Sequence, residues 1–443
     1  MQGLSKRLSA AYWRCLRIAS ARPRLRQAIL AWAAQAWVAQ DRQAHEAPVS
    51  LTLAKWTSLP DPGADTCAPD AMRTFLGRRE VDMSHSQKPG CYGDRVVLIS
   101  GAGGSIGSEI SRQILACKPR KVILFEMSEP ALYHIHRSMM EAASGTGVEI
   151  VPHLGSVAEA GGVGRVLRDH QVQVVLHAAA YKHVPLVESN PLAGLANNVL
   201  GTQTLVTQAA AAGVECFVLI SSDKAVRPTS IMGASKRLAE LVVQDVFRQH
   251  AAEQGLVFSI VRFGNVLGSS GSVIPLFQEQ LRRGGPLTVT HRDASRFFMT
   301  VQEAVHLVLC AGAIAQGGDM FVLDMGNPVK IEQLARRVIE NAGLAVRDAT
   351  NPGGDVDIVF TGLRSGEKMT EDLTFNGVLR LTKHPKIFST VEDGLSELEI
   401  ATALRGLRKA VAEGDAETAR ANACAWANGC DEAATSRARV ANG

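Results

Sequence analysis

The stretch RVVLISGAGGSIGSEI, residues 95–110, decides the fold of this chain. It opens on an apolar run, residues 96–99, of the kind found in strands that are buried on both faces of a parallel sheet. Glycines follow at positions 101, 103, 104 and 107, and a helical pattern begins at Ser108. Glycine permits a tight turn and lets backbone N–H groups at a helix N-terminus approach a pyrophosphate. The same glycines would also fit a tight turn without a ligand, but the strand before them and the helix after them favour a dinucleotide site.

Short β-branched runs alternate with helical patterns after residue 94, which is typical of βαβ units. The runs are residues 95–100, 121–126, 148–154, 172–180, 216–222 and 257–264. Later elements are less regular: a helix at 273–283, a strand at 320–324 and a helix at 331–342. We therefore predict an α/β fold, a Rossmann-type doubly wound parallel sheet, with a smaller C-terminal substrate-binding cap that includes these later elements.

The composition divides the chain into three predicted regions. Residues 1–90 are expected to be an N-terminal helical appendage followed by a linker, because residues 58–89 are rich in Pro, Asp, Gly and Ser. Residues 91–395 hold the Rossmann domain, with the cap contributed mainly by residues 265–390. Residues 396–443 are rich in Ala, Glu and Arg and are expected to form a helical tail.

The N-terminal region is basic: seven Lys and Arg residues precede Asp41, the first acidic residue. We interpret this region as a solvated helical arm, the commoner origin of such a pattern. Peripheral contact with an anionic membrane through the same residues is the alternative. No stretch reads as a transmembrane helix or a signal peptide, so we expect a soluble, cytoplasmic short form.

The composition argues against several other classes of protein. The net charge of +4 and the pI of about 8.6 are too mild to indicate a nucleic-acid partner. The 8 cysteines form no CxxC pair and no repeated spacing, so we expect neither a metal site nor a disulfide framework. A homo-oligomer is expected.

The second predicted strand ends at Glu126, 19 residues after Gly107. A carboxylate there can accept hydrogen bonds from ribose hydroxyls and would repel a 2′-phosphate, so NAD is expected as the cofactor in preference to NADP. The residues expected to contact or support the cofactor are Gly101, Gly103, Gly104, Ser105, Ile106, Gly107, Glu126, Ser156, Val157, Ala178, Ala179, Ala180, Lys182, Asn198, Ser221 and Lys236.

The GxxGxxG spacing is typical of short-chain and extended short-chain dehydrogenases, whose active-site helix carries Tyr-x-x-x-Lys. Here Met232 stands at the tyrosine position, four residues before Lys236. A thioether has no titratable proton and cannot do acid–base work. Asp223 and Lys224 follow Ser222 at the end of the fifth strand, where doubly wound sheets place their ligands. We therefore predict that this acid and base carry the chemistry, the alternative being an ordinary charged surface turn.

Seven motifs closely resemble the CapD-like family of polysaccharide-biosynthesis proteins, which are nucleotide-sugar 4,6-dehydratases of the extended short-chain dehydrogenase superfamily. The resemblance covers roughly residues 75–410, and Met232 is itself a feature of the larger dehydratases in this family. The motifs are residues 177–188, 222–225, 232–237, 262–268, 296–300, 362–368 and 384–386.

The resemblance implies a UDP-N-acetylglucosamine 4,6-dehydratase, acting on that sugar or a related UDP-N-acetylhexosamine for surface polysaccharide. The sugar would be oxidised at C4, lose water across C5 and C6, and be reduced at C6. Lys224 would take the C5 proton, Asp223 would protonate the departing C6 hydroxyl, and Lys236 would bind the nicotinamide ribose. The residues expected near the UDP-sugar are Lys182, Asn265, Ser269, Ser270, Arg296, Arg364 and Glu367. The guanidinium of Arg364 suits a pyrophosphate.

The chain departs from the family pattern at three positions. Ser365 stands where proline is usual, Phe297 where tyrosine is common, and Ser156 where an adenine-contacting aspartate is frequent. Two other functions fit the fold. A UDP-sugar 4-epimerase would need a base such as tyrosine at position 232, and an inactive NAD-binding scaffold would be expected to lack the Asp223–Lys224 pair.

Overall fold

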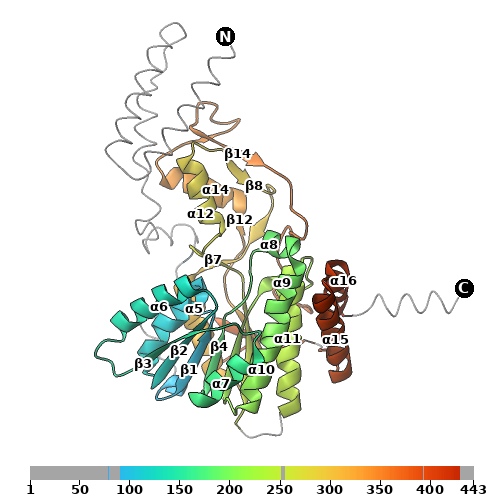
Figure 1. Ribbon diagram of the computed structural model, residues 1–443. Coiled ribbons are helices and arrows are strands. Elements are labelled where there is room, and N and C mark those ends of the chain that lie inside the picture. The colour runs from blue at the N-terminus through green and yellow to red at the C-terminus, as the bar shows by residue number, and fades with distance from the viewer. Residues whose placement is uncertain (1–77, 79–89, 251–254, 393, 430–443) are drawn as a thin grey trace, which may run out of the picture. The chain divides into compact units, whose positions relative to one another are not determined.

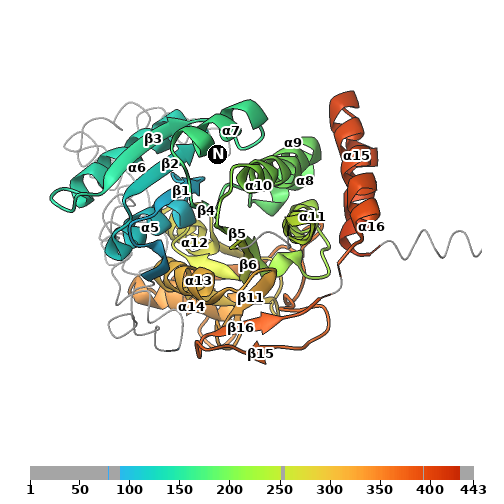
Figure 2. The same ribbon diagram turned by 90° about the horizontal axis from the view of Figure 1, so that it is seen from below.

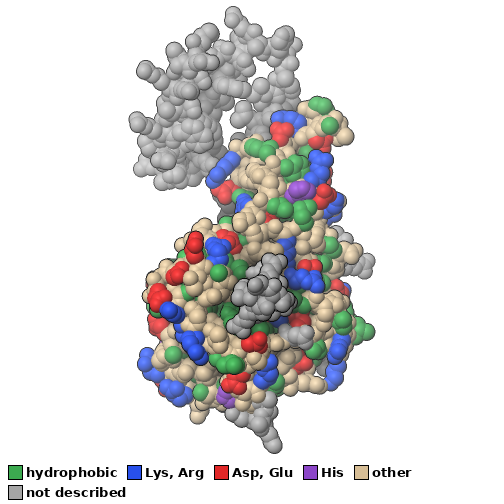
Figure 3. Space-filling view, turned by 90° about the vertical axis from the view of Figure 1, so that its right-hand side faces the viewer, with side chains coloured by type: hydrophobic (Ala, Val, Ile, Leu, Met, Phe, Trp, Pro, Cys, Tyr) green, Lys and Arg blue, Asp and Glu red, His purple; other side chains and the backbone are tan. Residues whose placement is uncertain are grey.

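The computed structural model describes Arg78 and residues 90–250, 255–392 and 394–429. The basic N-terminal segment and the rest of the predicted linker lie outside the described residues. Among the residues that are described, no helix combines the length and the apolar character needed to cross a membrane. Lys, Arg, Asp and Glu side chains of the described residues are interspersed on the face shown in Figure 3.

The described residues form a nine-stranded sheet with helices on both faces (Figures 1 and 2). Its strand order is β15-β16-β11-β6-β5-β4-β1-β2-β3, so the order reverses between β1 and β4, as in a doubly wound Rossmann fold. All pairs from β3 to β11 are parallel, and β16 and β15 add an antiparallel edge. The strands are β1 (Val96–Ser100), β2 (Lys121–Glu126), β3 (Glu149–Leu154), β4 (Val174–His177), β5 (Cys216–Ser222), β6 (Val257–Phe263), β11 (Asp319–Leu323), β15 (Arg380–Leu381) and β16 (Ile387–Thr390).

The sheet is sandwiched because its central strands are apolar on both sides. Val96 and Leu98 of β1 pack into one core, whereas Val97 and Ile99 pack into the other. In Figure 2 three helices cover the first face: α7 (Ala160–Asp169), α10 (Gly201–Ala211) and α11 (Ile231–His250). The opposite face carries α5 (Ser105–Ile114), α6 (Glu129–Ala142) and α13 (Val301–Ile314).

The fourth strand is shorter than the predicted run of residues 172–180. It ends at His177, and the chain then leaves the sheet. Beyond the end of the strand, the side chain of Asn198, in the π-helical turn η4 (Ala196–Leu200), takes the place of a neighbouring strand as the hydrogen-bond partner of the backbone. Its Oδ1 accepts the Tyr181 N–H at 2.8 Å and its Nδ2 donates to the Tyr181 carbonyl at 2.9 Å. A side chain that satisfies a backbone segment in this way cannot be inferred from strand propensity.

The cap lies above the sheet in Figure 1 and is built on α12 (Val273–Arg282) and α14 (Ile331–Asn341). A three-stranded sheet completes it: β8 (Leu287–Val289), β13 (Val346–Arg347) and β14 (Val356–Phe360). Two short pairs connect the cap to the body: β7 (Asn265–Leu267) with β10 (Phe298–Thr300), and β9 (Ser295–Arg296) with β12 (Val329–Lys330). The strand predicted at 320–324 differs from the expectation, because β11 pairs with β6 and so belongs to the main sheet rather than the cap.

The described part of the C-terminal tail forms α15 (Glu397–Glu413) and α16 (Ala416–Ala427). Ser396 caps α15 through a capping box with Glu399, and Gly414 ends that helix in the left-handed conformation. Both helices pack outside α11 (Figures 1 and 2). Arg420 of α16 forms an ion pair with Glu188 of α8 (Val184–Ser189), which ties the tail to the body.

A buried ion network joins β6, α11 and the segment after β16. The guanidinium of Arg262 is bidentate to Glu240, at 2.7 and 2.6 Å, and to Glu392, at 2.6 and 2.8 Å. Arg237 donates to both carboxylates at 3.2 Å, so two cations balance two anions. Burial alone would raise the pKa of Glu240, but Arg262 overcomes this effect and holds it below its ordinary value.

Removing one carboxylate should leave the network with an uncompensated buried cation. We predict that Glu392→Ala lowers the free energy of unfolding by about 3–5 kcal/mol, measured by denaturant titration. Glu413→Ala, which breaks an exposed pair with Lys409, is the matched control and should cost less than about 1 kcal/mol. An equally small loss for Glu392→Ala would contradict the role assigned to the network.

Candidate active site

A cleft of about 690 Å³ opens at the carboxyl ends of β1, β4, β5 and β6. Its walls come from the loop after β1, residues 180–183, residues 220–224, α8, α11 and residues 263–272. This volume is within the range of sites that hold small organic ligands. The cleft lies where the strand order reverses, the place where open parallel sheets bind ligands.

The glycine-rich loop is compressed between β4 and α5. Gly101 has φ +66°, and a Cβ atom there would lie 2.7 Å from the Ala179 Cα atom. A Cβ on Gly107 would lie 2.0 Å from the Gly101 carbonyl oxygen. Only glycine fits at these two positions. Ser105, at the start of α5, accepts the Ser270 N–H at 3.3 Å, which joins the loop to the far wall of the cleft.

Glu126 supports the same loop from β2. Its Oε2 accepts the Gly103 N–H at 3.0 Å, and its Oε1 accepts the Met127 and Ser128 N–H groups at 2.9 Å. A carboxylate offers about four lone-pair sites, so these three bonds leave roughly one for a ligand. Glu126 is therefore both a support for the loop and an acceptor of limited remaining capacity.

Met232 and Lys236 lie one helical turn apart on α11 and both line the cleft. Lys236 is buried and donates to the Ile220 carbonyl of β5 at 2.5 Å. Burial lowers its pKa to about 8, although the nearby Glu240 opposes this shift. Asn198 donates to Ser235 at 2.9 Å, and Ser221 of β5 donates to Glu240 at 2.6 Å. The helix is thus fixed against the strands that end in the cleft.

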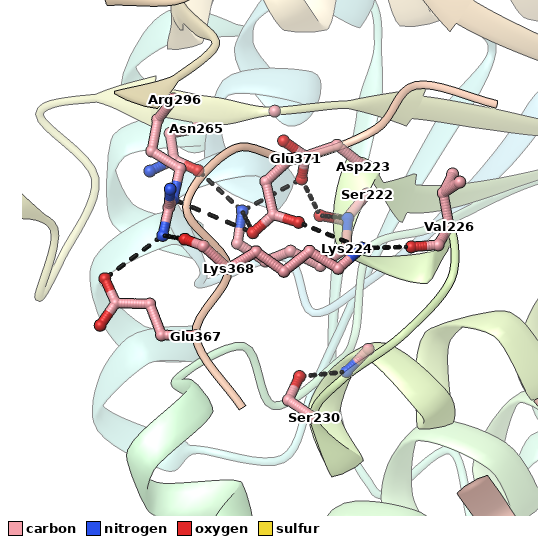
Figure 4. Close-up of polar contacts among 12 residues, drawn as sticks. Ser222, Asp223, Lys224, Val226, Ser230, Asn265, Arg296, Glu367, Lys368 and Glu371 are labelled. Carbon is pink, nitrogen blue, oxygen red and sulfur yellow. Dashed lines mark hydrogen bonds and ion pairs between the residues drawn. The ribbon is translucent and has the colours of Figure 1, made fainter. Parts of the chain in front are cut away.

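Lys224 is the charged group at the centre of the cluster in Figure 4. Its Nζ atom donates to Asp223 Oδ1 at 3.0 Å and to Asn265 Oδ1 at 2.8 Å. The Lys224 side chain lines the cleft and is 20% exposed, whereas the Asp223 side chain is fully buried behind it. Ser222, which also lines the cleft, donates to Asp223 Oδ1 at 2.8 Å. Asp223 Oδ2 is buried and has no hydrogen-bond partner among the described residues.

Glu371 was not among the residues selected from the sequence. Its Oε1 lies 3.9 Å from Lys224 Nζ and 3.9 Å from Arg296 Nε. Its Oε2 is buried without a hydrogen-bond partner among the described residues. Burial raises the pKa of Glu371, the Asp223 carboxylate adds to the rise, and Lys224 opposes it. Its signal in the sequence is its position three residues after the motif of residues 362–368, which holds Arg364 and Glu367.

The Arg296 guanidinium is hydrogen-bonded to the segment that follows β14. It donates to the carbonyls of Met369 and Lys368 at 3.0 and 2.8 Å, and to Glu367 Oε1 at 3.2 Å. Lys368 itself donates to the Val226 carbonyl at 2.7 Å. Arg296 therefore fixes this segment beside Lys224, and contact between Arg296 and a substrate would require it to exchange these partners (Figure 4). Arg364 is exposed on the same segment.

The structure gathers most of the residues selected from the sequence around one cleft. Ser156 and Val157 are separate from the lining: the Ser156 hydroxyl accepts the Ala158 N–H at 3.2 Å, and Val157 packs in the core. The selected residues that line the cleft are Gly104, Ser105, Ile106, Gly107, Ala178, Ala180, Lys182, Ser221, Ser222, Lys224, Met232, Lys236, Asn265, Ser269 and Ser270. Those that do not line it are Gly101, Gly103, Glu126, Ser156, Val157, Ala179, Asn198, Asp223, Arg296, Arg364 and Glu367.

The buried Lys236 predicts a pH-dependent stability difference. Its folded pKa of about 8 lies below its ordinary value of 10.5, so the unfolded chain binds more protons between these two pH values. The cost of burying the charge is therefore complete below about pH 8 and disappears as the pH rises towards 10.5. The free energy of unfolding of Lys236→Met, relative to the wild type, should fall by roughly 3 kcal/mol across this window. Lys383→Met, which removes an exposed lysine, is the matched control; a difference for Lys236→Met that does not change across this window would refute the lowered pKa of Lys236.

Comparison with known proteins places the chain in a family. A family model described as polysaccharide biosynthesis protein matches residues 97–392. The chain is 45% identical over 299 residues to the capsular polysaccharide biosynthesis protein CapD of Staphylococcus aureus, which covers 68% of this chain and 48% of CapD. It is also 45% identical over 301 residues to the probable polysaccharide biosynthesis protein EpsC of Bacillus subtilis strain 168, with 68% and 48% covered. The chain thus spans about half the length of these relatives.

A solved structure agrees with this placement. The X-ray structure of Pen from Bacillus thuringiensis is 32% identical to the chain, with a TM-score of 0.59, and the match covers 67% of this chain and 89% of Pen. The match to the family model, over residues 97–392, spans the Rossmann sheet, the cleft and the Lys224 cluster described above. The chain belongs to the polysaccharide biosynthesis protein family, in its CapD-like branch of the extended short-chain dehydrogenase superfamily.

Proposed function

We propose that the chain is an NAD-dependent nucleotide-sugar 4,6-dehydratase that acts on UDP-N-acetylglucosamine or a related UDP-N-acetylhexosamine. The observation that carries this proposal is the Asp223–Lys224 pair at the cleft, beside a helix on which Met232 replaces the usual tyrosine. An acid–base pair away from the helix suits elimination of water better than simple oxidation of an alcohol. The family's role in polysaccharide biosynthesis supports a sugar destined for a surface polysaccharide.

The cleft fits a dinucleotide cofactor. The loop at Gly101 and Gly107 brings the main chain close enough for the N-terminus of α5 to receive a pyrophosphate. Lys236 would hold the nicotinamide ribose, and the remaining acceptor capacity of Glu126 would suit a ribose hydroxyl. The Glu126 carboxylate would repel a 2′-phosphate, which favours NAD over NADP. When bound, NAD accepts a hydride from the sugar C4 and returns it at C6.

Lys224 is proposed as the base that removes the C5 proton. Oxidation at C4 makes the neighbouring C5–H bond acidic, so that a nearby amine can take its proton. Asn265 and Asp223 each accept one N–H of Lys224, and this fixes the Nζ atom at the edge of the cleft. Lys224 must be in its neutral form to act as the base, and the pair of hydrogen bonds then orients its lone pair.

Asp223 is proposed as the source of the proton for the departing C6 hydroxyl. Its side chain is fully buried, so the proton would pass through Ser222 or Lys224, which both contact Asp223 Oδ1 and reach the cleft. Glu371, 3.9 Å from the Lys224 Nζ atom, would hold this proton near the reacting groups. Burial and the Asp223 carboxylate raise the pKa of Glu371 against the effect of Lys224, which favours a proton on Glu371.

The sugar nucleotide would lie between the cleft and the cap. Asn265, Ser269 and Ser270 line the wall of the cleft that leads to α12. Arg364 is exposed on the cap and can approach a diphosphate, whereas Arg296 and Glu367 act first as partners of each other. Lys182 also lines the cleft, and burial lowers its pKa.

A UDP-sugar 4-epimerase is the second candidate, because it would use the same fold and the same cofactor. Epimerisation at C4 needs no base at C5 and no acid at C6, so an epimerase would leave the Asp223–Lys224 pair without a role. A cofactor-binding scaffold without activity would not require Lys224 to be held by two hydrogen bonds at the cleft. Both alternatives predict that no water is eliminated from the sugar.

The glycine-rich loop gives a test of cofactor binding. Gly101→Ala should abolish NAD binding, because its Cβ atom would lie 2.7 Å from the Ala179 Cα atom. Gly213→Ala is the matched control, since Gly213 also has positive φ, +72°, but its Cβ atom would meet nothing within 4 Å. Isothermal titration with NAD should therefore separate the two variants. Equal NAD affinities would show that the loop does not hold the cofactor.

The proposed base gives the central test. Wild-type protein incubated with UDP-N-acetylglucosamine and NAD should yield a product lighter by one water, and in deuterated water this product should carry deuterium at C5. Lys224→Met should lose at least about 10²–10⁴-fold in product formation while its NAD affinity is unchanged. Lys383→Met is the matched control and should behave as the wild type.

The outcomes of that test distinguish the proposals. If Lys224→Met exchanges the C5 proton at the wild-type rate, another residue is the base. A wild-type protein that inverts C4 without loss of water would establish the epimerase instead. Normal turnover by Asp223→Asn would remove Asp223 as the proton source.

A further inference from the structure

A second group of reactive side chains lies away from the cleft, on α13 and the turn before β16. His306 and Cys310 are one helical turn apart on α13, and His384 lies between β15 and β16. One ligand atom from each of the three residues lies within 4.8 Å of the other two. Cys310 is buried, both histidines are partly buried, and none of the three lines the cleft.

The spacing of these atoms matches that of ligands around a single ion. Cys310 Sγ and His306 Nε2 are 3.6 Å apart. In a tetrahedral site with Zn–S of about 2.3 Å and Zn–N of about 2.0–2.1 Å, a sulfur and a nitrogen ligand lie about 3.6 Å apart. The His-x-x-x-Cys spacing produces this distance because residues four apart lie on the same helical face. His384 then supplies a third ligand from a different part of the fold.

We propose that His306, Cys310 and His384 form a binding site for one divalent transition-metal ion of the Zn²⁺ class. One thiolate and two imidazoles suit a borderline-soft ion such as Zn²⁺, and the fourth position would hold water. The site departs from the sequence-based expectation of no metal, because that expectation considered only spacings between cysteines. It is independent of the proposed dehydratase activity.

The protonation states of the three groups are compatible with this role. Burial lowers the pKa of both histidines, which favours the neutral imidazole that binds metals. Burial raises the pKa of the Cys310 thiol to about 11, so without an ion the thiol keeps its proton and shares it with His306. An incoming Zn²⁺ forms the Zn–S bond as the S–H bond breaks, and the proton leaves to solvent.

Binding should also change one backbone hydrogen bond. The Nδ1 atom of His384 accepts the Lys386 N–H at 3.2 Å. An ion bound at Nδ1 would replace that donor, whereas an ion bound at Nε2 would require a proton on Nδ1, which then could not accept. Either way the Lys386 amide loses this partner. The ion would connect α13 to the antiparallel edge of the main sheet, where Lys386 forms an ion pair with Asp324 at 2.8 Å.

Cobalt provides the first test, since it occupies zinc sites and is coloured. The untagged full-length protein, freed of metal with a chelator, should bind one equivalent of Co²⁺. The complex should show a thiolate-to-cobalt charge-transfer band and visible bands of the intensity expected for four ligands, and Zn²⁺ should displace the cobalt. The absence of a charge-transfer band, with the protein folded, would refute the site.

Variants assign the ligands. Cys310→Ser should abolish the charge-transfer band, and His306→Ala and His384→Ala should weaken Co²⁺ binding by more than about 100-fold, since even outer partners of a metal are worth about 10–100-fold. Cys424→Ser, in α16, and His134→Ala, at an exposed histidine of α6, are matched controls and should bind as the wild type. A band that persists in Cys310→Ser would place the ion elsewhere.

A measurement on the wild type covers the case in which a variant fails to fold. Anomalous diffraction at the zinc edge from crystals grown with Zn²⁺ should place a peak between His306, Cys310 and His384. A peak at another position, or none, would overturn the proposal. Because NAD binding and water loss use other residues, failure of the metal site would leave the proposed function intact.

Discussion

The structure depends on the burial of one guanidinium, that of Arg262. Its side chain is 1% exposed and meets two carboxylates at once, Glu240 of α11 and Glu392 after β16. A buried arginine without such partners would be strongly unfavourable, so β6, α11 and the end of the main sheet must come together in one arrangement. Glu240 also accepts the Ser221 hydroxyl, and in this way the network extends to β5, which ends two residues before Lys224.

The parallel sheet brings loops from separate parts of the chain together at one site. Because parallel strands all end on the same edge, the loops after β1, β4, β5 and β6 face one cleft although they are far apart in the chain. The helix α11 then brings Met232 and Lys236 to the same edge. Burial of Lys236 lowers the pKa of its amine, although the nearby Glu240 opposes this shift. The stability of the core and the electrostatics of the cleft thus share residues.

The cluster around Lys224 shows how the cap contributes to the chemistry. Two acids, Asp223 and Glu371, form ion pairs with one lysine, yet only Lys224 of the three lines the cleft. Arg296 holds the segment that carries Glu371 in place through the carbonyls of residues 368 and 369. A carboxyl with a raised pKa beside a second carboxyl is suited to store a proton, which an elimination reaction must both take up and release.

The sequence by itself determined the features that arise from local patterns. The apolar run of β1, the glycine-rich loop and Glu126 are read from neighbouring residues, and the observed strands β1, β2 and β5 end where the pattern predicts. The i,i+4 relation of Met232 and Lys236, and the place of Asp223 and Lys224 at a strand end, also follow from local periodicity.

Only the tertiary structure decided which distant residues meet. Glu371 reaches Lys224, Glu392 pairs with Arg262, and His384 approaches Cys310 because separate elements pack together, not because of any spacing in the chain. The same holds for β11, which joins the main sheet through β6, and for Asp223, which the fold buries behind its neighbour. Local propensity describes the backbone of each segment, whereas burial and pairing are properties of the packed whole.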